Sequence, residues 1–156
     1  MRDGYLGDYP PLKRIVKSCL WADVREYAEG LVAVADRQGY YGYLDADTQP
    51  VIPCRWTYAD DFSEGLAAVA DERGRYGFID RQGRPAIPCV WHWAYRFSEG
   101  LAAVMDANGE WGFIDKDARL VVPCEWNEVE WFTDGHARVW DSEHRAYIID
   151  QYGHII

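Results

Sequence analysis

The chain has no long apolar run and an excess of acidic residues. Among its 156 residues, no stretch approaches the roughly 18 apolar residues that a membrane-spanning helix needs. The opening residues, MRDGYLGDYPP, lack the basic and apolar regions of a signal peptide. Lysine and arginine number 16 against 26 aspartates and glutamates, and the net charge of −10 disfavours nucleic acid and anionic lipid as partners. We therefore expect a cytoplasmic protein that binds neither nucleic acid nor membrane.

The usual patterns of catalysis and metal binding are missing too. The sequence has no Gly-rich phosphate loop, no nucleophile elbow and no pair of histidines at metal-binding spacing. The four cysteines, which form no Cys-x-x-Cys pair, are interpreted as small apolar core residues rather than as zinc ligands or disulfide partners. We expect no enzyme activity, no cofactor and no metal.

What the sequence does contain is a repeat with a period of 35 residues and no gaps. Glycine follows an acidic residue once per period, and cysteine is followed two positions later by tryptophan. The glycines are Gly30, Gly65, Gly100 and Gly135; the Cys-x-Trp pairs are Cys19 and Trp21, Cys54 and Trp56, Cys89 and Trp91, and Cys124 and Trp126. A fixed period of this length is typical of repeat proteins, whose units must stack to bury their apolar faces.

The period divides one predicted domain, residues 1–156, into unequal parts. Residues 1–11 match no part of the repeat and are predicted to form an N-terminal arm. A half unit follows at 12–28, then full units at 29–63, 64–98 and 99–133, and an incomplete terminal unit at 134–156.

Each full unit predicts a three-stranded antiparallel meander. In the second unit, residues 66–70 and 76–79 are short apolar runs, and residues 85–91 form a third. The segments between them carry Asp at the first and Gly at the fourth position of a tight turn. Pro88 removes a ladder hydrogen bond, so the third strand is expected at a sheet edge or bulged, and Gly77 marks a bulge or a close approach of backbone. No window keeps a helical period, so helices should be few and short.

Three motifs at fixed spacing resemble the bacterial WG-repeat family. They are residues 110–115 (EWGFID), residues 97–102 (FSEGLA) and residues 121–124 (VVPC), and the resemblance covers residues 15–156. Two units have Tyr-Gly in place of Trp-Gly, and the last unit departs further, with Ala146-Tyr147 at that step and His136 after the acidic Gly pair. The resemblance implies a β-rich repeat scaffold and carries over no catalytic residues.

The fold class predicted is all-β, with the 35-residue meanders stacked as an open β-solenoid-like repeat domain. The alternative is a small closed propeller-like ring, in which residues 12–21 complete the unit that begins at Asp134. We favour the open stack because three strands per unit are fewer than the four of a usual propeller blade.

Much of the acidity is assigned to this scaffold. Aspartates begin both turns of each unit, and Glu29, Glu64, Glu99 and Asp134 precede the strand-opening glycines. We attribute all of these carboxylates to hydrogen bonding within turns.

The positions that vary between units are the better candidates for function. They follow each Cys-x-Trp pair, between an apolar and an aromatic position that are held in every unit. Those selected as partner-binding residues are Tyr58, Asp60, Asp61, Trp93, Tyr95, Arg96, Glu128, Glu130 and Trp131. Large aromatics flanked by carboxylates are typical of a protein-binding surface. Trp91, which repeats in every unit, is by contrast expected in the core.

Two functions fit this pattern. The first is a non-enzymatic module that binds a protein with a basic site, in its sharper form an immunity protein that neutralises a bacterial toxin. The alternative is a carbohydrate or small-ligand binder, with Trp93, Tyr95 and Trp131 as stacking platforms for sugar rings.

Overall fold

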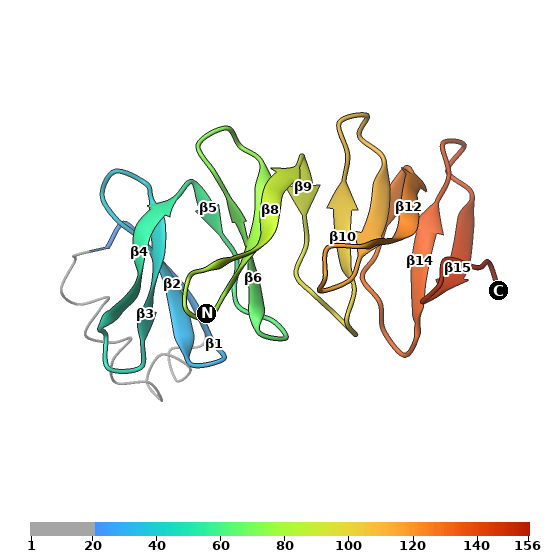
Figure 1. Ribbon diagram of the computed structural model, residues 1–156. Helices are drawn as coiled ribbons and strands as arrows, with labels where there is room; N and C mark the ends of the chain where they lie inside the picture. Colours follow the sequence, from blue (N-terminus) through green and yellow to red (C-terminus); the bar gives the residue numbers. More distant parts are fainter. Residues whose placement is uncertain (1–20) are drawn as a thin grey trace.

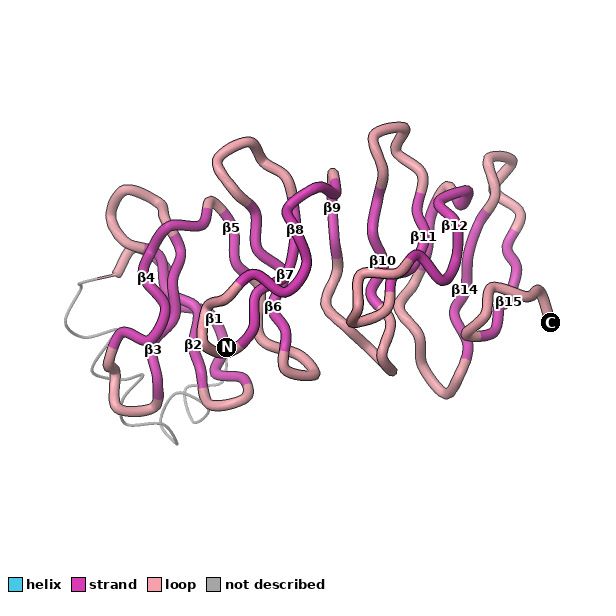
Figure 2. Tube along the Cα trace, in the orientation of Figure 1, coloured by secondary structure: helices cyan, strands magenta, loops and turns pink. Residues whose placement is uncertain are grey.

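A computed structural model describes residues 21–156 and shows four antiparallel β-sheets standing in a row (Figure 1). Within this range the chain forms strands, turns and loops only (Figure 2), and it contains no apolar helix of membrane-spanning length. The N-terminal arm, Cys19 and most of residues 12–21 lie outside the described residues.

The strands follow one another in chain order within every sheet. The first sheet contains β1 (Asp23–Ala28), β2 (Leu31–Ala35), β3 (Tyr41–Asp45) and β4 (Pro50–Trp56). The second contains β5 (Tyr58–Ala59), β6 (Leu66–Ala70), β7 (Tyr76–Asp80) and β8 (Pro85–Trp91). The third contains β9 (Trp93–Ala94), β10 (Ala102–Met105), β11 (Trp111–Ile114) and β12 (Leu120–Trp126). The fourth contains β13 (Glu128–Val129), β14 (His136–Trp140) and β15 (Ala146–Asp150).

The predicted all-β stack of antiparallel meanders is confirmed, and the structure adds a first strand to each of them, which is 2 residues long in the second, third and fourth sheets. This strand comes from the segment after Cys-x-Trp, where the chain leaves one sheet and enters the next. The backbone N–H of Thr57, between β4 and β5, already donates to Ala70 of the second sheet, at 2.9 Å. Complete sheets therefore have four strands, so the reason given for the open stack fails. The open stack itself stands, because the first and last sheets lie at opposite ends of the row (Figure 1).

The apolar cores lie between neighbouring sheets. In β6 all five residues are buried: Ala67 and Val69 pack towards the first sheet, while Leu66, Ala68 and Ala70 pack towards the third. A strand buried on both faces needs a continuous apolar run rather than alternation, which explains the sequence LAAVA. Its alanines are small enough to let the sheets approach closely.

Each junction between sheets is also closed by one edge-to-face aromatic pair. The ring centroids of Tyr43 and Phe62 are 4.9 Å apart, and Phe78–Phe97 and Phe113–Phe132 repeat the contact at 4.8 Å. Such pairs add stability beyond the area they bury. The aromatic position held after every Cys-x-Trp thus belongs to the core.

The bulge predicted at Gly77 and Pro88 is present. β8 is an edge strand, and its pairing with β7 jumps from Tyr76–Trp91 to Phe78–Ile87, so that three residues of β8 lie opposite Gly77. A Cβ atom on Gly77 would lie 2.4 Å from the carbonyl oxygen of Ile87. The glycine is required because the two backbones touch.

The tryptophan of the Cys-x-Trp pair is less uniform than the repeat suggests. Trp56 and Trp126 are buried, as expected of core residues. Trp91 is only half-buried, although it packs against the core between the second and third sheets. Trp91 was expected in the core, and it lies at the edge of the core rather than inside it.

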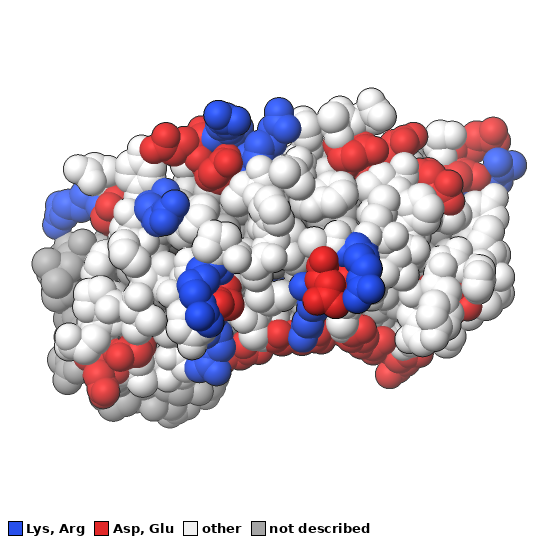
Figure 3. Space-filling model, viewed as in Figure 1, with Lys and Arg blue, Asp and Glu red and all other residues white. Residues whose placement is uncertain are grey.

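Carboxylates hold the turns, with one correction to the prediction. All eight aspartates that begin the two turns of each unit accept two backbone N–H bonds; for Asp71 the donors are Arg73 and Arg75. The glutamates before the strand-opening glycines do something else, since Glu64 accepts N–H bonds from Glu99 and Gly100 of the next sheet. Figure 3 shows acidic side chains gathered along the upper and lower edges of the molecule, where the turns lie.

Candidate functional site

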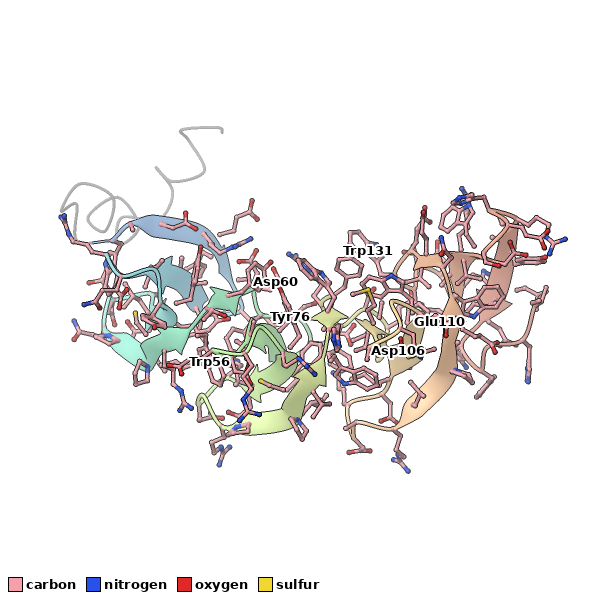
Figure 4. All side chains as sticks on the ribbon, turned by 90° about the horizontal axis from the view of Figure 1, so that it is seen from above. Trp56, Asp60, Tyr76, Asp106, Glu110 and Trp131 are labelled. Atoms are coloured by element: carbon pink, nitrogen blue, oxygen red, sulfur yellow. The ribbon has the colours of Figure 1, made fainter. Side chains whose placement is uncertain are left out.

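The predicted binding residues lie on or just beyond the first strands of three sheets. Because β1, β5, β9 and β13 occupy the same edge of each sheet, residues 23–26, 58–61, 93–96 and 128–131 form one surface, which we call the first-strand face. Figure 4 shows Asp60 and Trp131 on the same side of the row. Two depressions open on this face, with volumes of about 680 and about 470 Å³.

Aromatic rings link the first three sheets across this face. The ring centroid of Tyr58 lies 6.4 Å from Tyr41 and 5.7 Å from Tyr76, and Trp93 lies 4.8 Å from Tyr76. Tyr41 and Tyr76 occupy the WG position of their units, so each packs on a variable aromatic of the next sheet. Trp93 remains 42 % exposed, while Tyr58 is half-buried and contributes to packing as well as to surface.

Asp60 and Asp61 are not the solvent-facing carboxylates that the sequence predicts, since they are only 7 % and 8 % exposed. Asp60 Oδ1 accepts hydrogen bonds from the backbone N–H of Asp61 at 2.8 Å and from Arg96 Nη2 at 2.9 Å. Asp61 Oδ2 lies 3.9 Å from the same Arg96 nitrogen. Arg96, 36 positions after Asp60, thus joins the second and third sheets electrostatically.

Arg25 of β1 completes this charged group from the other side. Its guanidinium carbon lies 5.2 Å from the ring centroid of Tyr58, within cation–π range. Burial, and then the neighbouring Asp60, raise the pKa of Asp61 above its ordinary value, and Arg96 and Arg25 only partly oppose this. Asp61 thus lies near two arginines whose charges do not fully offset its burial.

The larger depression, which we call the Trp131 cleft, lies between the third and fourth sheets. Trp131 is 56 % exposed, and Tyr95 stacks on Trp111 with centroids 4.9 Å apart and planes 5° from parallel. The cleft is lined by Tyr95, Val129, Glu130, Trp131, Thr133, His136, Ala137, Arg138 and Ile148. An exposed tryptophan beside an apolar hollow with a polar rim is the usual form of a binding surface.

The fourth sheet opens this cleft by departing from the repeat. Ile148 stands where the earlier units have Tyr43, Phe78 and Phe113, which are buried in the junctions. In the fourth sheet this position is 37 % exposed and lines the cleft.

Sequence reasoning missed several residues of the two depressions. His136 and Arg138 replace the leucine and alanine of other units; only His136 was noted, as an irregularity of the last unit, and Arg138 and Ile148 were not singled out. That departure from the repeat was the signal that could have identified them. Arg25 stands at a variable position too, but it was left out of the predicted set.

The structure divides the predicted set into three groups. Tyr95, Glu130 and Trp131 meet at the Trp131 cleft, while Asp61 and Arg96 line the smaller depression with Asp60 and Tyr58 beside them. Trp93 packs on Tyr76, and Glu128 is exposed on β13, but neither lines a depression.

None of the three described cysteines forms a disulfide. Cys54, Cys89 and Cys124 are free and half-buried rather than fully buried. Burial, followed by the nearby Asp106 and Glu110 (Figure 4), raises the pKa of Cys124 to about 11, so this thiol is protonated at neutral pH. Between residues 21 and 156 no three His, Cys, Asp or Glu side chains are grouped as a metal site would require.

Several solved structures are similar to this chain in fold. The designed protein Ika8 superposes with a TM-score of 0.57 at 10 % identity, over 86 % of this chain and 48 % of that one. The designed Ika4 gives 0.53 at 13 % identity, over 81 % and 88 %. BamB from Moraxella catarrhalis gives 0.51 at 13 % identity, over 86 % and 48 %. The chain thus spans about half the length of Ika8 and of BamB.

Sequence comparison adds the family. No curated protein sequence matches the chain significantly. The profile described as "WG containing repeat" matches residues 41–71, 76–109 and 111–139, more than half of the chain. These segments hold the strands and the aromatic-glycine steps from which the stacked sheets are built. The chain therefore belongs to the WG-repeat family.

Proposed function

We propose that the chain is a non-enzymatic module that binds another protein through its first-strand face. The observation that carries this proposal is Trp131, a large aromatic that is 56 % exposed beside a cleft of about 680 Å³. Tryptophan contributes disproportionately to protein–protein binding energy when a partner covers it. An apolar side chain of the partner would enter the cleft between Tyr95 and Ile148.

The partner is expected to present a basic surface around that apolar anchor. The chain carries a net charge of −10, and Glu128 in β13 and Glu130 directly after it precede Trp131. Complementary charge increases association rates and selects among partners. Arg138 and His136, which also line the cleft, would bind individual acidic groups of the partner.

The sharper form of the proposal is that the partner is a toxin and that this chain is its immunity protein. An acidic module that covers a basic active site would block an enzyme acting on nucleic acid or nucleotides. A gene for such a toxin beside the gene for this chain would support this form. Co-expression that fails to protect cells from that toxin would contradict it.

The geometry favours a protein partner over a sugar. Of the three aromatics proposed as sugar platforms, Trp93 packs on Tyr76 and Tyr95 stacks on Trp111, so one face of each ring is already covered. Trp131 is the remaining ring for which the described residues supply no such partner. A single platform beside an apolar cleft suits a protein anchor better than a chain of sugar rings.

The proposal is tested by capturing proteins from a lysate of the source organism on immobilised wild type, Trp131→Ala and Tyr152→Ala. Tyr152, which is 65 % exposed and lies outside the cleft, is the matched control. A protein retained by wild type and by Tyr152→Ala, but not by Trp131→Ala, is expected. With the purified partner, calorimetry should show a loss of about 2 kcal/mol or more for Trp131→Ala.

Equal capture by all three proteins would contradict the proposed site. A glycan array that responds to wild type but not to Trp131→Ala would instead establish the carbohydrate alternative.

A further inference from the structure

The smaller depression of the first-strand face is a separate, charged pocket. It has a volume of about 470 Å³ and lies where the first three sheets meet. It is lined by Asp23, Val24, Arg25 and Glu26 of β1, by Asp61 after β5, and by Arg96 after β9. In contrast to the Trp131 cleft, most of its lining side chains carry a charge.

One lining carboxylate is buried but incompletely bonded. Asp61 is 8 % exposed, and its Oδ1 atom is buried without a hydrogen-bond partner among the described residues. Arg96 Nη2 hydrogen bonds to Asp60 at 2.9 Å and stays 3.9 Å from Asp61 Oδ2. A buried acceptor without a donor is destabilising, and more so when it is charged, so an atom of this kind in a folded protein needs an explanation.

The charges of the lining residues indicate which class of ligand the pocket would attract. Asp23, Glu26 and Asp61 contribute three carboxylates, while Arg96 is already bonded to Asp60 and Arg25 lies over the Tyr58 ring. An anion would meet these carboxylates and be repelled. A cation that donates hydrogen bonds would be attracted by the same groups, and Asp61, which lines the pocket, is the carboxylate among them with an oxygen left unbonded.

We infer that this pocket binds a basic side chain, the guanidinium or ammonium group of an arginine or lysine on the partner protein, with Asp61 as its acceptor. The inference rests on the proposed function, because it assigns the basic group expected of the partner to a particular place on the first-strand face. The Trp131 cleft then takes the apolar anchor, and this pocket selects for charge.

Protonation of Asp61 should tune this binding. Burial, then Asp60 and to a smaller extent Glu26, raise its pKa, and Arg96 and Arg25 lower it. A bound cation favours the ionised form. Binding should therefore release a proton wherever Asp61 is still protonated, and it should strengthen as the pH rises through the pKa of Asp61.

The inference can be tested without knowing the partner. The ¹⁵N-labelled protein is titrated with N-acetyl-arginine N-methylamide and, in parallel, with the uncharged citrulline analogue. The arginine probe should shift the amide signals of Glu26, Asp61 and Arg96, and the citrulline probe should leave them in place. Asp61→Asn should weaken the response about fivefold or more, which corresponds to about 1 kcal/mol.

Matched variants separate a built site from general attraction. Glu128→Gln removes an exposed carboxylate from the same face outside the pocket, and it should leave the titration unchanged. Glu26→Gln removes an exposed carboxylate from the pocket itself, so a weakened response there supports the inference even if Asp61→Asn folds poorly.

An equal response of wild type and a folded Asp61→Asn, or equal losses in Glu26→Gln and Glu128→Gln, would overturn the inference. That result would leave the protein-binding proposal standing, since it is decided by capture on Trp131→Ala. If Trp131→Ala captured the same proteins as wild type while the arginine titration was positive, the protein-binding proposal would be contradicted and the charged pocket would be supported.

Discussion

The backbone N–H of Gly100 donates a hydrogen bond of 2.9 Å to Oε1 of Glu64, which lies in the preceding sheet. The N–H of Glu99 donates to the other oxygen of the same carboxylate, at 2.6 Å. Glu99 in turn accepts from Asp134 and Gly135 of the fourth sheet. Glu64 and Glu99 hold φ angles of 55° and 54°, which side chains other than glycine rarely adopt. The glutamate is retained at this unfavourable φ because its carboxylate joins two sheets.

Replacing Glu64 by alanine should lower the free energy of unfolding by about 1.5–3 kcal/mol, since two charge-assisted hydrogen bonds are lost. Urea unfolding followed by tryptophan fluorescence measures the change. Glu72→Ala, an exposed carboxylate at the tip of a hairpin in the same unit, is the control and should change stability by less than about 0.5 kcal/mol. Equal effects of the two substitutions would show that the contact between sheets contributes nothing.

The contact between Glu64 and Gly100 shows which features can be predicted from the sequence. The strands and the bulge could be predicted, because each has a signal within a few residues. The repeat could not predict that Glu64 bonds to Gly100, because donor and acceptor recur with the same period and a turn within one unit explains the pattern as well. Only the stacking distance between sheets decides between the two.

Gly77→Ala should lower the free energy of unfolding by at least about 3 kcal/mol, because its Cβ would lie 2.4 Å from the carbonyl oxygen of Ile87 and neither backbone can move away. Gly74→Ala is the informative comparison. Its Cβ would meet nothing within 4 Å, but its φ is +75°, so it should cost about 1–2 kcal/mol. Urea unfolding of both variants measures the difference, and a smaller loss for Gly77→Ala would contradict the close approach of the two backbones.

Tryptophans of the scaffold and of the surface should differ in their effect on stability. Trp56 is 6 % exposed in the core between the first two sheets, and Trp56→Ala should cost about 3–5 kcal/mol. Trp93→Ala should cost only about 0.5–1.5 kcal/mol, because the change removes little more than its contact with Tyr76. Thermal and urea melts decide this, and equally large losses would place Trp93 in the core.

The candidate site was harder to predict than the fold. Comparison of units identified the segments of the first-strand face as the place where Trp131, Tyr95 and Arg96 vary. It could not show that Asp60 is buried, because the arginine that covers it is supplied by the next sheet. Ile148 escaped notice because an aliphatic residue at a core position carries no sign that its junction partner is missing.

Acid should weaken the hairpin between β14 and β15 through Asp141. The backbone N–H of Arg145, then its side chain and the N–H of Glu143, lower the pKa of Asp141 to about 2, against 3.8 as the ordinary value. Its contribution to stability is therefore present above about pH 4 and lost as the pH falls through about 2. Asp141→Ala should be less stable than wild type at neutral pH, and urea unfolding should show this difference shrinking across that window. Glu125→Ala, which removes an exposed carboxylate, should show no such trend.

Asp61 should have the opposite pH dependence. Burial and the neighbouring Asp60 raise its pKa above 3.8 in the folded protein, so the native state binds a proton more readily than the unfolded chain. The stabilisation from the protonated form is complete below the unfolded pKa and is lost as the pH rises through the folded one. Asn at this position keeps the shape of the protonated form without its charge. Asp61→Asn should therefore be as stable as wild type or more so at pH 7, and urea unfolding between pH 4 and pH 8 should show this advantage disappearing towards the acidic end. If Asp61→Asn were instead strongly destabilised at pH 7, the carboxylate would be a structural partner of Arg96, and its unbonded oxygen would no longer indicate a ligand.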